Sequence, residues 1–151
     1  MATTITTLAG VTLITLQSSP ANSDFISEVF ERIAKEKINV DMISMSPTRS
    51  SLTELSFTIS DDDLIKTLKF TKDLKTDLAI KSIVSSVNHK ISIYDKEMKN
   101  ASGFASKVFS AIKSSDADIR LITTSEVEIS LLVSEADFDK VFDNITKTFS
   151  S

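Results

Sequence analysis

Two loops that lead into predicted helices carry the residues best suited to hold a small molecule. The first loop ends in Ser23-Asp24-Phe25, and the second ends in Ser102-Gly103-Phe104. The first turn of a helix has unpaired backbone N–H groups and a partial positive charge, which together suit an anion. We therefore expect a carboxylate, such as the α-carboxylate of an amino acid, to bind at these loops.

An ammonium group on the same ligand would need an acid nearby. The start of the next predicted strand supplies Asn39-Val40-Asp41, and we expect this strand start to lie beside the first loop. In a crevice that excludes water, one charge-assisted hydrogen bond contributes about 1.5–3 kcal/mol. Asp41 is also consistent with an ordinary solvated acid at the start of a strand, and both interpretations stay open.

The composition excludes several kinds of catalytic site. The 151 residues include no Cys and a single His, His89, so there is no thiolate metal site, no cysteine nucleophile and no multi-histidine metal site. The sequence also lacks the phosphate-binding pattern GxxxxGK[ST]. Asp61-Asp62-Asp63 follows Ser60 and is interpreted as the acidic first turn of a helix. We expect no enzymatic activity, no cofactor and no metal.

Charge and hydropathy bear on the partners of the chain. It carries 17 basic and 21 acidic residues, a net charge of -4, and the basic residues are scattered, which argues against a nucleic-acid partner. No apolar run approaches the roughly 18 residues of a membrane-spanning helix, and residues 1–10 lack the basic start of a signal peptide. We expect a soluble, cytoplasmic protein that binds no membrane.

The sequence contains an internal repeat. At a constant offset of 79 residues, the helical apolar set of the first copy matches that of the second, namely Phe25, Val29, Phe30 and Ile33 against Phe104, Val108, Phe109 and Ile112. After five extra residues around Pro47–Ser51, the offset becomes 74 and Glu54–Ser60 matches Glu128–Ser134. The pattern indicates a tandem duplication.

The first copy is predicted to fold as one βαββαβ unit. Its elements are a strand over 10–16, a helix over 24–37, strands over 38–45 and 54–59, a helix after Ser60, and a strand from Leu78 to Val84. The apolar residues alternate in the strands and recur at helical spacing in the helices. The fold class is therefore α+β with a ferredoxin-like topology.

The second copy repeats this order but lacks its last strand. The predicted elements are a strand over 91–94, a helix over 102–114, strands over 119–124 and 127–133, and a helix over 135–149. We predict that an N-terminal strand, Thr3–Leu8, completes this sheet, because an open sheet edge would promote aggregation. The two units would then comprise residues 10–87 and residues 3–8 plus 88–151.

The repeated runs resemble a known protein family. Phe25–Phe30 with Ile38–Ile43, and Phe104–Phe109 with Leu121–Ser130, resemble the paired ACT domains in the regulatory region of aspartate kinases. The resemblance covers nearly the whole chain. It implies two ferredoxin-like ACT units in a separate regulatory subunit, a stand-alone protein or a fragment, with no kinase domain.

The resemblance also implies a function and site residues. It implies an allosteric module that binds a free amino acid, usually lysine or threonine, that forms homodimers through side-by-side ACT units, and that serves an aspartate kinase catalytic subunit. Asp41 would hold the amino groups of the effector, and Thr124, Ser125 and Glu126 would line a pocket between domains. Ser125-Glu126 is equally consistent with a simple turn between two strands.

Each copy departs from the family pattern at one point. Asp24 stands where the family has a Gly before the helix Phe, and Arg120 replaces the acid of the second copy although Gly103 is kept. Three interpretations follow: a composite pocket between the first unit of one chain and the second unit of another, a changed effector, or lost binding. The alternative function is a ligand-free dimerisation or docking module for an enzyme subunit.

Overall fold

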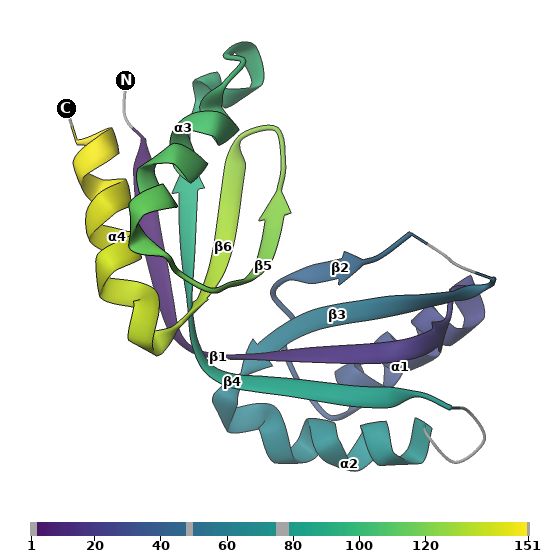
Figure 1. Ribbon diagram of the computed structural model, residues 1–151. Coiled ribbons are helices and arrows are strands. Elements are labelled where there is room, and N and C mark those ends of the chain that lie inside the picture. Colours follow the sequence, from purple (N-terminus) through teal and green to yellow (C-terminus); the bar gives the residue numbers. More distant parts are fainter. Residues whose placement is uncertain (1–2, 48–49, 75–78, 151) are drawn as a thin grey trace. The chain divides into compact units, whose positions relative to one another are not determined.

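The fold consists of two units that share two long strands. The computed structural model describes residues 3–47, 50–74 and 79–150 (Figure 1). Gly10–Ser86 forms the first unit, and residues 1–9 with 87–151 form the second unit. Leu78, where the last strand of the first copy was expected to begin, lies outside the described residues, as do Thr48 and Arg49 of the five-residue excess.

The first unit has the predicted βαββαβ order. Its elements are the second part of β1 (Thr4–Pro20), α1 (Ser23–Lys35), β2 (Ile43–Met45), β3 (Leu52–Ser60), the 3₁₀ turn η1 (Asp61–Asp63), α2 (Leu64–Leu74) and the first part of β4 (Lys81–Tyr94). The strand order is β2-β3-β1-β4, and β3 pairs antiparallel with both β1 and β2. This is the order of a ferredoxin-like sheet.

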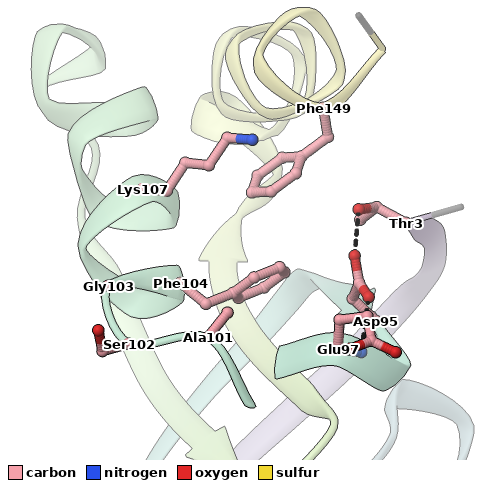
Figure 2. A pocket seen from close by; sticks show the side chains of 9 residues that line it. All are labelled: Thr3, Asp95, Glu97, Ala101, Ser102, Gly103, Phe104, Lys107 and Phe149. Carbon is pink, nitrogen blue, oxygen red and sulfur yellow. Dashed lines mark hydrogen bonds between the residues drawn. The ribbon is translucent and has the colours of Figure 1, made fainter. Parts of the chain in front are cut away.

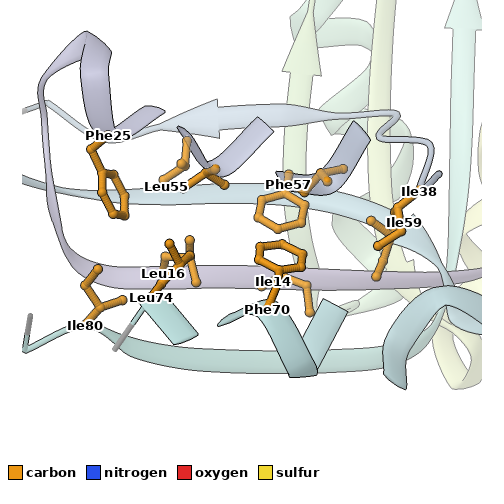
Figure 3. Close-up of a cluster of buried hydrophobic side chains, with 12 residues drawn as sticks. Ile14, Leu16, Phe25, Ile38, Leu55, Phe57, Ile59, Phe70, Leu74 and Ile80 are labelled. Carbon is orange, nitrogen blue, oxygen red and sulfur yellow. The ribbon is translucent and has the colours of Figure 1, made fainter. Parts of the chain in front are cut away.

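One apolar core holds the first unit together. Alternate residues of β1 and β3, such as Ile14, Leu16 and Phe57, face α1, which contributes Phe25 (Figure 3). Burying one side chain of this size stabilises the fold by about 1.5–3 kcal/mol. The side chain of Asn22 caps α1, accepting a hydrogen bond from the backbone N–H of Phe25 at 2.8 Å. The core and the cap together fix the direction in which α1 leaves β1.

The second unit is completed by the N-terminus of the chain. Its elements are the first part of β1, the second part of β4, the 3₁₀ turn η2 (Lys96–Asn100), α3 (Phe104–Ile112), the 3₁₀ turn η3 (Lys113–Ser115), β5 (Ile119–Thr124), β6 (Glu128–Ser134) and α4 (Glu135–Phe149). The strand order β5-β6-β4-β1 places β1 in the fourth position, and Ile5 packs on the core of this unit. The predicted fold class, including the N-terminal strand, is confirmed.

Two strands differ from the expected ones. The expected strands at Thr3–Leu8 and at residues 10–16 are one continuous strand, β1. The regular part of β2 is only Ile43–Met45, shorter than the predicted 38–45, because the hydroxyl of Thr58 accepts the backbone N–H of Met42 at 2.9 Å. The Met42 N–H thus bonds to a side chain instead of to the backbone of β3, and the regular pairing of β2 with β3 begins only at Ile43.

Both shared strands have an unusual residue where one unit ends and the other begins. Gly10 in β1 has φ of 66°, and Val87 in β4 has φ of 59°. A glycine adopts this left-handed conformation at little cost, whereas a β-branched residue there is strained. The backbone of β4 therefore stores strain at the residue that opens the second unit.

Candidate ligand-binding site

A pocket of about 340 Å³ lies in the second unit, where the loop between β4 and α3 meets both ends of the chain (Figure 2). The loop follows β4 and includes η2, and α3 begins at its end. Nine residues line the pocket: Thr3, Asp95, Glu97, Ala101, Ser102, Gly103, Phe104, Lys107 and Phe149.

Asp95 supplies a fixed negative charge to this pocket. It directly follows β4, is only 5% exposed, and accepts hydrogen bonds from the Glu97 backbone N–H at 2.9 Å and from the Thr3 hydroxyl at 2.8 Å (Figure 2). The Glu97 N–H, followed by the Thr3 hydroxyl, holds the pKa of Asp95 below its ordinary value. Asp95 is therefore ionised at neutral pH, and Glu97 brings a second carboxyl group to the same wall.

The N-terminus of α3 borders the pocket and has no side-chain cap. Gly103 precedes the helix with φ of 89°, and within the described part of the chain this helix start has no side-chain cap hydrogen bond. The first helical bond joins the Lys107 N–H to the Gly103 carbonyl at 2.9 Å. The backbone N–H groups before Lys107 thus remain available for an anion, helped by the positive end of the helix dipole.

Two phenylalanines and a lysine form the remaining wall. The rings of Phe104 and Phe149 have centroids 5.4 Å apart, and Lys107 Nζ lies 4.6 Å from the centroid of Phe149. Figure 2 shows the Lys107 side chain extended toward the Phe149 ring. This cation–π contact keeps the ammonium near the apolar wall. The pocket therefore offers acids, a cation with free N–H donors, and an apolar surface, a combination that suits a zwitterion.

The structure brings together part of the predicted set. Ser102, Gly103 and Phe104 line the pocket, as the loop pattern suggested. Thr124 ends β5, and Ser125 and Glu126 form the exposed turn that follows, at the same end of the sheet. The Asp95 N–H donates to the carbonyl of Val127, the next residue of that turn, at 2.9 Å. Thr124, Ser125 and Glu126 do not themselves line the pocket.

Ser125 makes the hydrogen bonds of a turn between β5 and β6. Its backbone N–H donates to the Glu128 carbonyl at 2.9 Å, and its hydroxyl accepts the Val127 N–H at 3.3 Å. Arg120, which stands in place of the family acid, is ion-paired with Asp118 at 3.2 Å. A role for Ser125 and Glu126 in ligand binding stays a prediction.

The predicted residues of the first unit are placed differently. Ser23 and Asp24 are exposed in the first turn of α1, whereas Phe25 is buried in the core. The Asn22 cap already occupies the Phe25 N–H that a carboxylate would use. Asn39 and Asp41 are exposed, and Val40 is half-buried beside the core.

The expectation that Asp41 lies beside the first loop is wrong. The Asp41 N–H donates to the carbonyl of Thr58 on β3, whereas Pro20, at the loop end of β1, pairs with Leu52. Positions 52 and 58 are about 20 Å apart along an extended strand. The reason is topological: α1 runs back along the sheet, so β2 begins at the end opposite to the loop.

Sequence reasoning missed five of the pocket residues that carry a charge, a hydroxyl group or an aromatic ring. Asp95 and Glu97 could have been found as an acid that follows a strand and caps the next turn, with a second acid two residues later. The sequence places Thr3 and Phe149 in elements of the second unit but does not place them at its loop end. Lys107 lies within the predicted helix over 102–114 and carries no separate signal.

No three His, Asp or Glu side chains among residues 3–47, 50–74 and 79–150 are placed to hold a metal ion. Within the same ranges, no helix combines the length and the apolar character needed to cross a bilayer.

Comparison with known proteins identifies the fold. Residues 91–149 match the ACT domain family. This segment is an ACT domain. It contains the loop, α3, β5, β6 and α4, and therefore most of the pocket.

Relatives extend the match over most of the chain. An aspartokinase of Bacillus sp. (strain MGA3) is 30% identical over 140 residues, which are 92% of this chain and 34% of that protein. Aspartokinase 2 of Bacillus subtilis is 27% identical over the same shares of the two chains. The chain thus spans about a third of the length of these relatives.

Solved structures agree with this placement. The ligand-free regulatory subunit of aspartate kinase from Thermus thermophilus has a TM-score of 0.89 and 24% identity, with 99% of both chains covered. A structure of aspartokinase alpha and beta subunits has a TM-score of 0.87 and 22% identity, with both chains covered completely. The predicted resemblance to the regulatory region of aspartate kinases is confirmed, and the chain has the fold of these regulatory subunits.

Proposed function

We propose that this chain is a non-catalytic regulatory module of an aspartate kinase that binds a free amino acid in the pocket at the start of α3. The observation that carries the proposal is the pairing, in one pocket, of the buried carboxylate of Asp95 with the uncapped N-terminus of α3. The two ACT units of the module would be residues 10–87 and residues 3–8 plus 88–151.

The pocket would hold each part of an amino acid with a different group. The α-ammonium would bind Asp95, and the α-carboxylate would bind the free N–H groups of α3 together with Lys107. The side chain would pack against Phe104 and Phe149. Each charge-assisted hydrogen bond of this kind contributes about 1.5–3 kcal/mol.

Lysine and threonine are the effectors to test first. A zwitterion is neutral, and the pocket has two acids, Asp95 and Glu97, against one cation, Lys107. The second ammonium of lysine would balance the remaining acid by reaching Glu97. The hydroxyl of threonine would instead hydrogen-bond to Ser102. The charge count favours lysine of the two.

Binding of the amino acid would change how the ACT units pack in a homodimer. The ligand would stabilise one packing of ACT units in a homodimer more than another, and a catalytic aspartate kinase subunit would respond to that equilibrium. The solved alpha and beta subunits of an aspartokinase, which match over the whole chain, support a partner of this kind.

A specific observation also supports the alternative, a ligand-free docking or dimerisation module. Strands at the sheet edges carry exposed apolar side chains: Ile43 on β2 is 52% exposed and Ile122 on β5 is 44% exposed. Edge strands with apolar residues favour pairing with another chain. Such a module would need no small molecule.

Isothermal titration calorimetry with L-lysine and L-threonine, preceded by a thermal-shift screen of the twenty amino acids, separates these functions. We expect saturable binding by the wild type, at least tenfold weaker binding by Asp95→Asn, and wild-type affinity in Asp139→Asn, an exposed acid on α4 of the same unit. A flat screen would favour the docking module. Loss of binding in Asp41→Ala alone would move the site to the first unit.

A further inference from the structure

The hydrogen bond between Thr3 and Asp95 joins the start of β1 to the pocket. The Thr3 hydroxyl donates to Asp95 Oδ2 at 2.8 Å across 92 positions of sequence. Thr3 directly precedes β1, and Figure 2 shows its side chain directed at the Asp95 carboxylate on the pocket wall. Among the residues that the structure describes, no other pocket-lining residue comes from this strand or its start.

Both partners of this bond have unused capacity to accept hydrogen bonds. A carboxylate can accept about four, and Asp95 accepts one at each oxygen from Thr3 and from Glu97. The Thr3 oxygen keeps lone pairs after donating its proton. An ammonium group has three donors, so it can bind the Thr3 oxygen and the Asp95 carboxylate together.

We infer that Thr3 is a positioning residue of the pocket and that, through it, ligand binding stabilises the start of β1. The inference rests on the proposed function, since it needs an ammonium at Asp95. Without ligand, the neutral hydroxyl of Thr3 holds the strand start against the loop. With ligand, the ammonium bridges Thr3 and Asp95 and adds a second link between the strand start and the loop.

The link works in both directions. If the ligand tightens the contact between Thr3 and Asp95, then that contact must raise the affinity for the ligand by the same factor. The ligand thereby affects β1, which extends from Thr4 to Pro20 and has a left-handed residue at Gly10. Its later part, from Gly10 on, is a central strand of the first unit, between β3 and β4. A ligand bound in the second unit thereby affects the first unit through the backbone of β1.

Hydrogen exchange of the full chain, followed by mass spectrometry or NMR with and without saturating L-lysine, tests this inference. In the wild type, lysine should slow exchange of the amides of residues 4–9 as well as those at the start of α3. Thr3→Val, which keeps the shape of the side chain and removes the hydroxyl, should bind lysine about tenfold more weakly. At a saturating concentration it should protect α3 but not residues 4–9.

Two variants control for effects on folding. Thr3→Ser restores the hydroxyl and should recover both the affinity and the protection of residues 4–9. Thr6→Val makes the same substitution at an exposed position of the same strand and should behave as the wild type. A merely structural role of Thr3 would lower stability without changing the pattern of protection by lysine.

Three results would overturn the inference, and they can be told apart. Protection of α3 without protection of residues 4–9 in the wild type would leave the pocket in place and remove the link to β1. Wild-type lysine affinity in Thr3→Val would remove the positioning role. Absence of both lysine and threonine binding to the wild type would overturn the proposed function and the inference with it.

Discussion

Asn22 Oδ1 accepts the backbone N–H of Phe25 at 2.8 Å and so closes the N-terminus of α1. At the matching helix of the second unit, Gly103 precedes Phe104 and has no side chain to offer. The two copies of one sequence motif therefore differ in the feature that would receive a carboxylate. The helix of the first unit is capped by its own chain, whereas that of the second unit is open to the pocket.

Replacing Asn22 with Ala should lower the free energy of unfolding by about 1 kcal/mol, because α1 loses its cap. The change should leave lysine binding unaltered, since the proposed pocket lies in the second unit. Urea denaturation and calorimetry measure the two effects. Ser27→Ala, at an exposed position of α1, serves as the control and should change stability little. A large loss of affinity in Asn22→Ala would show that the loop of the first unit binds the ligand.

Replacing Val87 with Gly should raise stability. Val87 is 52% exposed and has φ of 59°, a conformation whose strain in a β-branched residue costs on the order of 1–3 kcal/mol. The greater freedom of Gly in the unfolded chain offsets roughly 0.5–1 kcal/mol of the gain. Val84→Gly, on the same strand and 38% exposed, relieves no such strain and should destabilise. Equal destabilisation of both variants would contradict the prediction.

Much of this fold could be predicted because the repeated pattern is local. The helix Glu135–Phe149, with Ser134 as its cap, and the strand Ile119–Thr124 have the predicted bounds. The missing last strand of the second copy pointed to the N-terminus. The continuity of β1 could not be read from the sequence, because Gly10 normally signals a break and here allows a left-handed residue within the strand.

The candidate site was harder to predict because its walls come from distant parts of the chain. The Gly103-Phe104 start of α3 has a local signal, whereas Thr3 and Phe149 reach the pocket only through the packing of both chain ends. The sequence predicts Asp41 beside the wrong loop, because spacing alone does not show at which end of the sheet β2 begins. The hydrogen bond from the Asp41 N–H to the Thr58 carbonyl shows at which end β2 begins, and this pairing between strands forms only in the folded chain.

Stability should fall in acid, partly through Asp95 and Asp137. The Asp118 backbone N–H and Lys140 hold the pKa of Asp137 below its ordinary value, as the Glu97 N–H and Thr3 do for Asp95. A carboxyl whose pKa is lower in the folded chain stabilises the fold above its unfolded pKa, about 3.9. That stability is lost as the pH falls through the lower folded pKa.

Urea denaturation between pH 7 and pH 2.5 checks this prediction. Asp95→Asn and Asp137→Asn should each flatten the acid part of the profile relative to the wild type. Lysine binding, if it uses ionised Asp95, should weaken over the same acid range. An acid slope that survives in the Asp95 and Asp137 variants would contradict the assigned causes.

Replacing Lys107 with Met should weaken lysine and threonine binding about tenfold, because the α-carboxylate would lose a charged donor. Met retains the apolar contact with Phe149, so stability should change little. Lys107→Arg keeps both the charge and the cation–π contact and should bind nearly as well as the wild type.

Lys113→Met, which replaces an exposed lysine outside the pocket, is the matched control. Calorimetry at two salt concentrations gives the decisive comparison, since a contact of opposite charges should weaken with salt in the wild type and much less in Lys107→Met. Unchanged affinity in Lys107→Met would leave the N–H groups of α3 as the sole carboxylate donors.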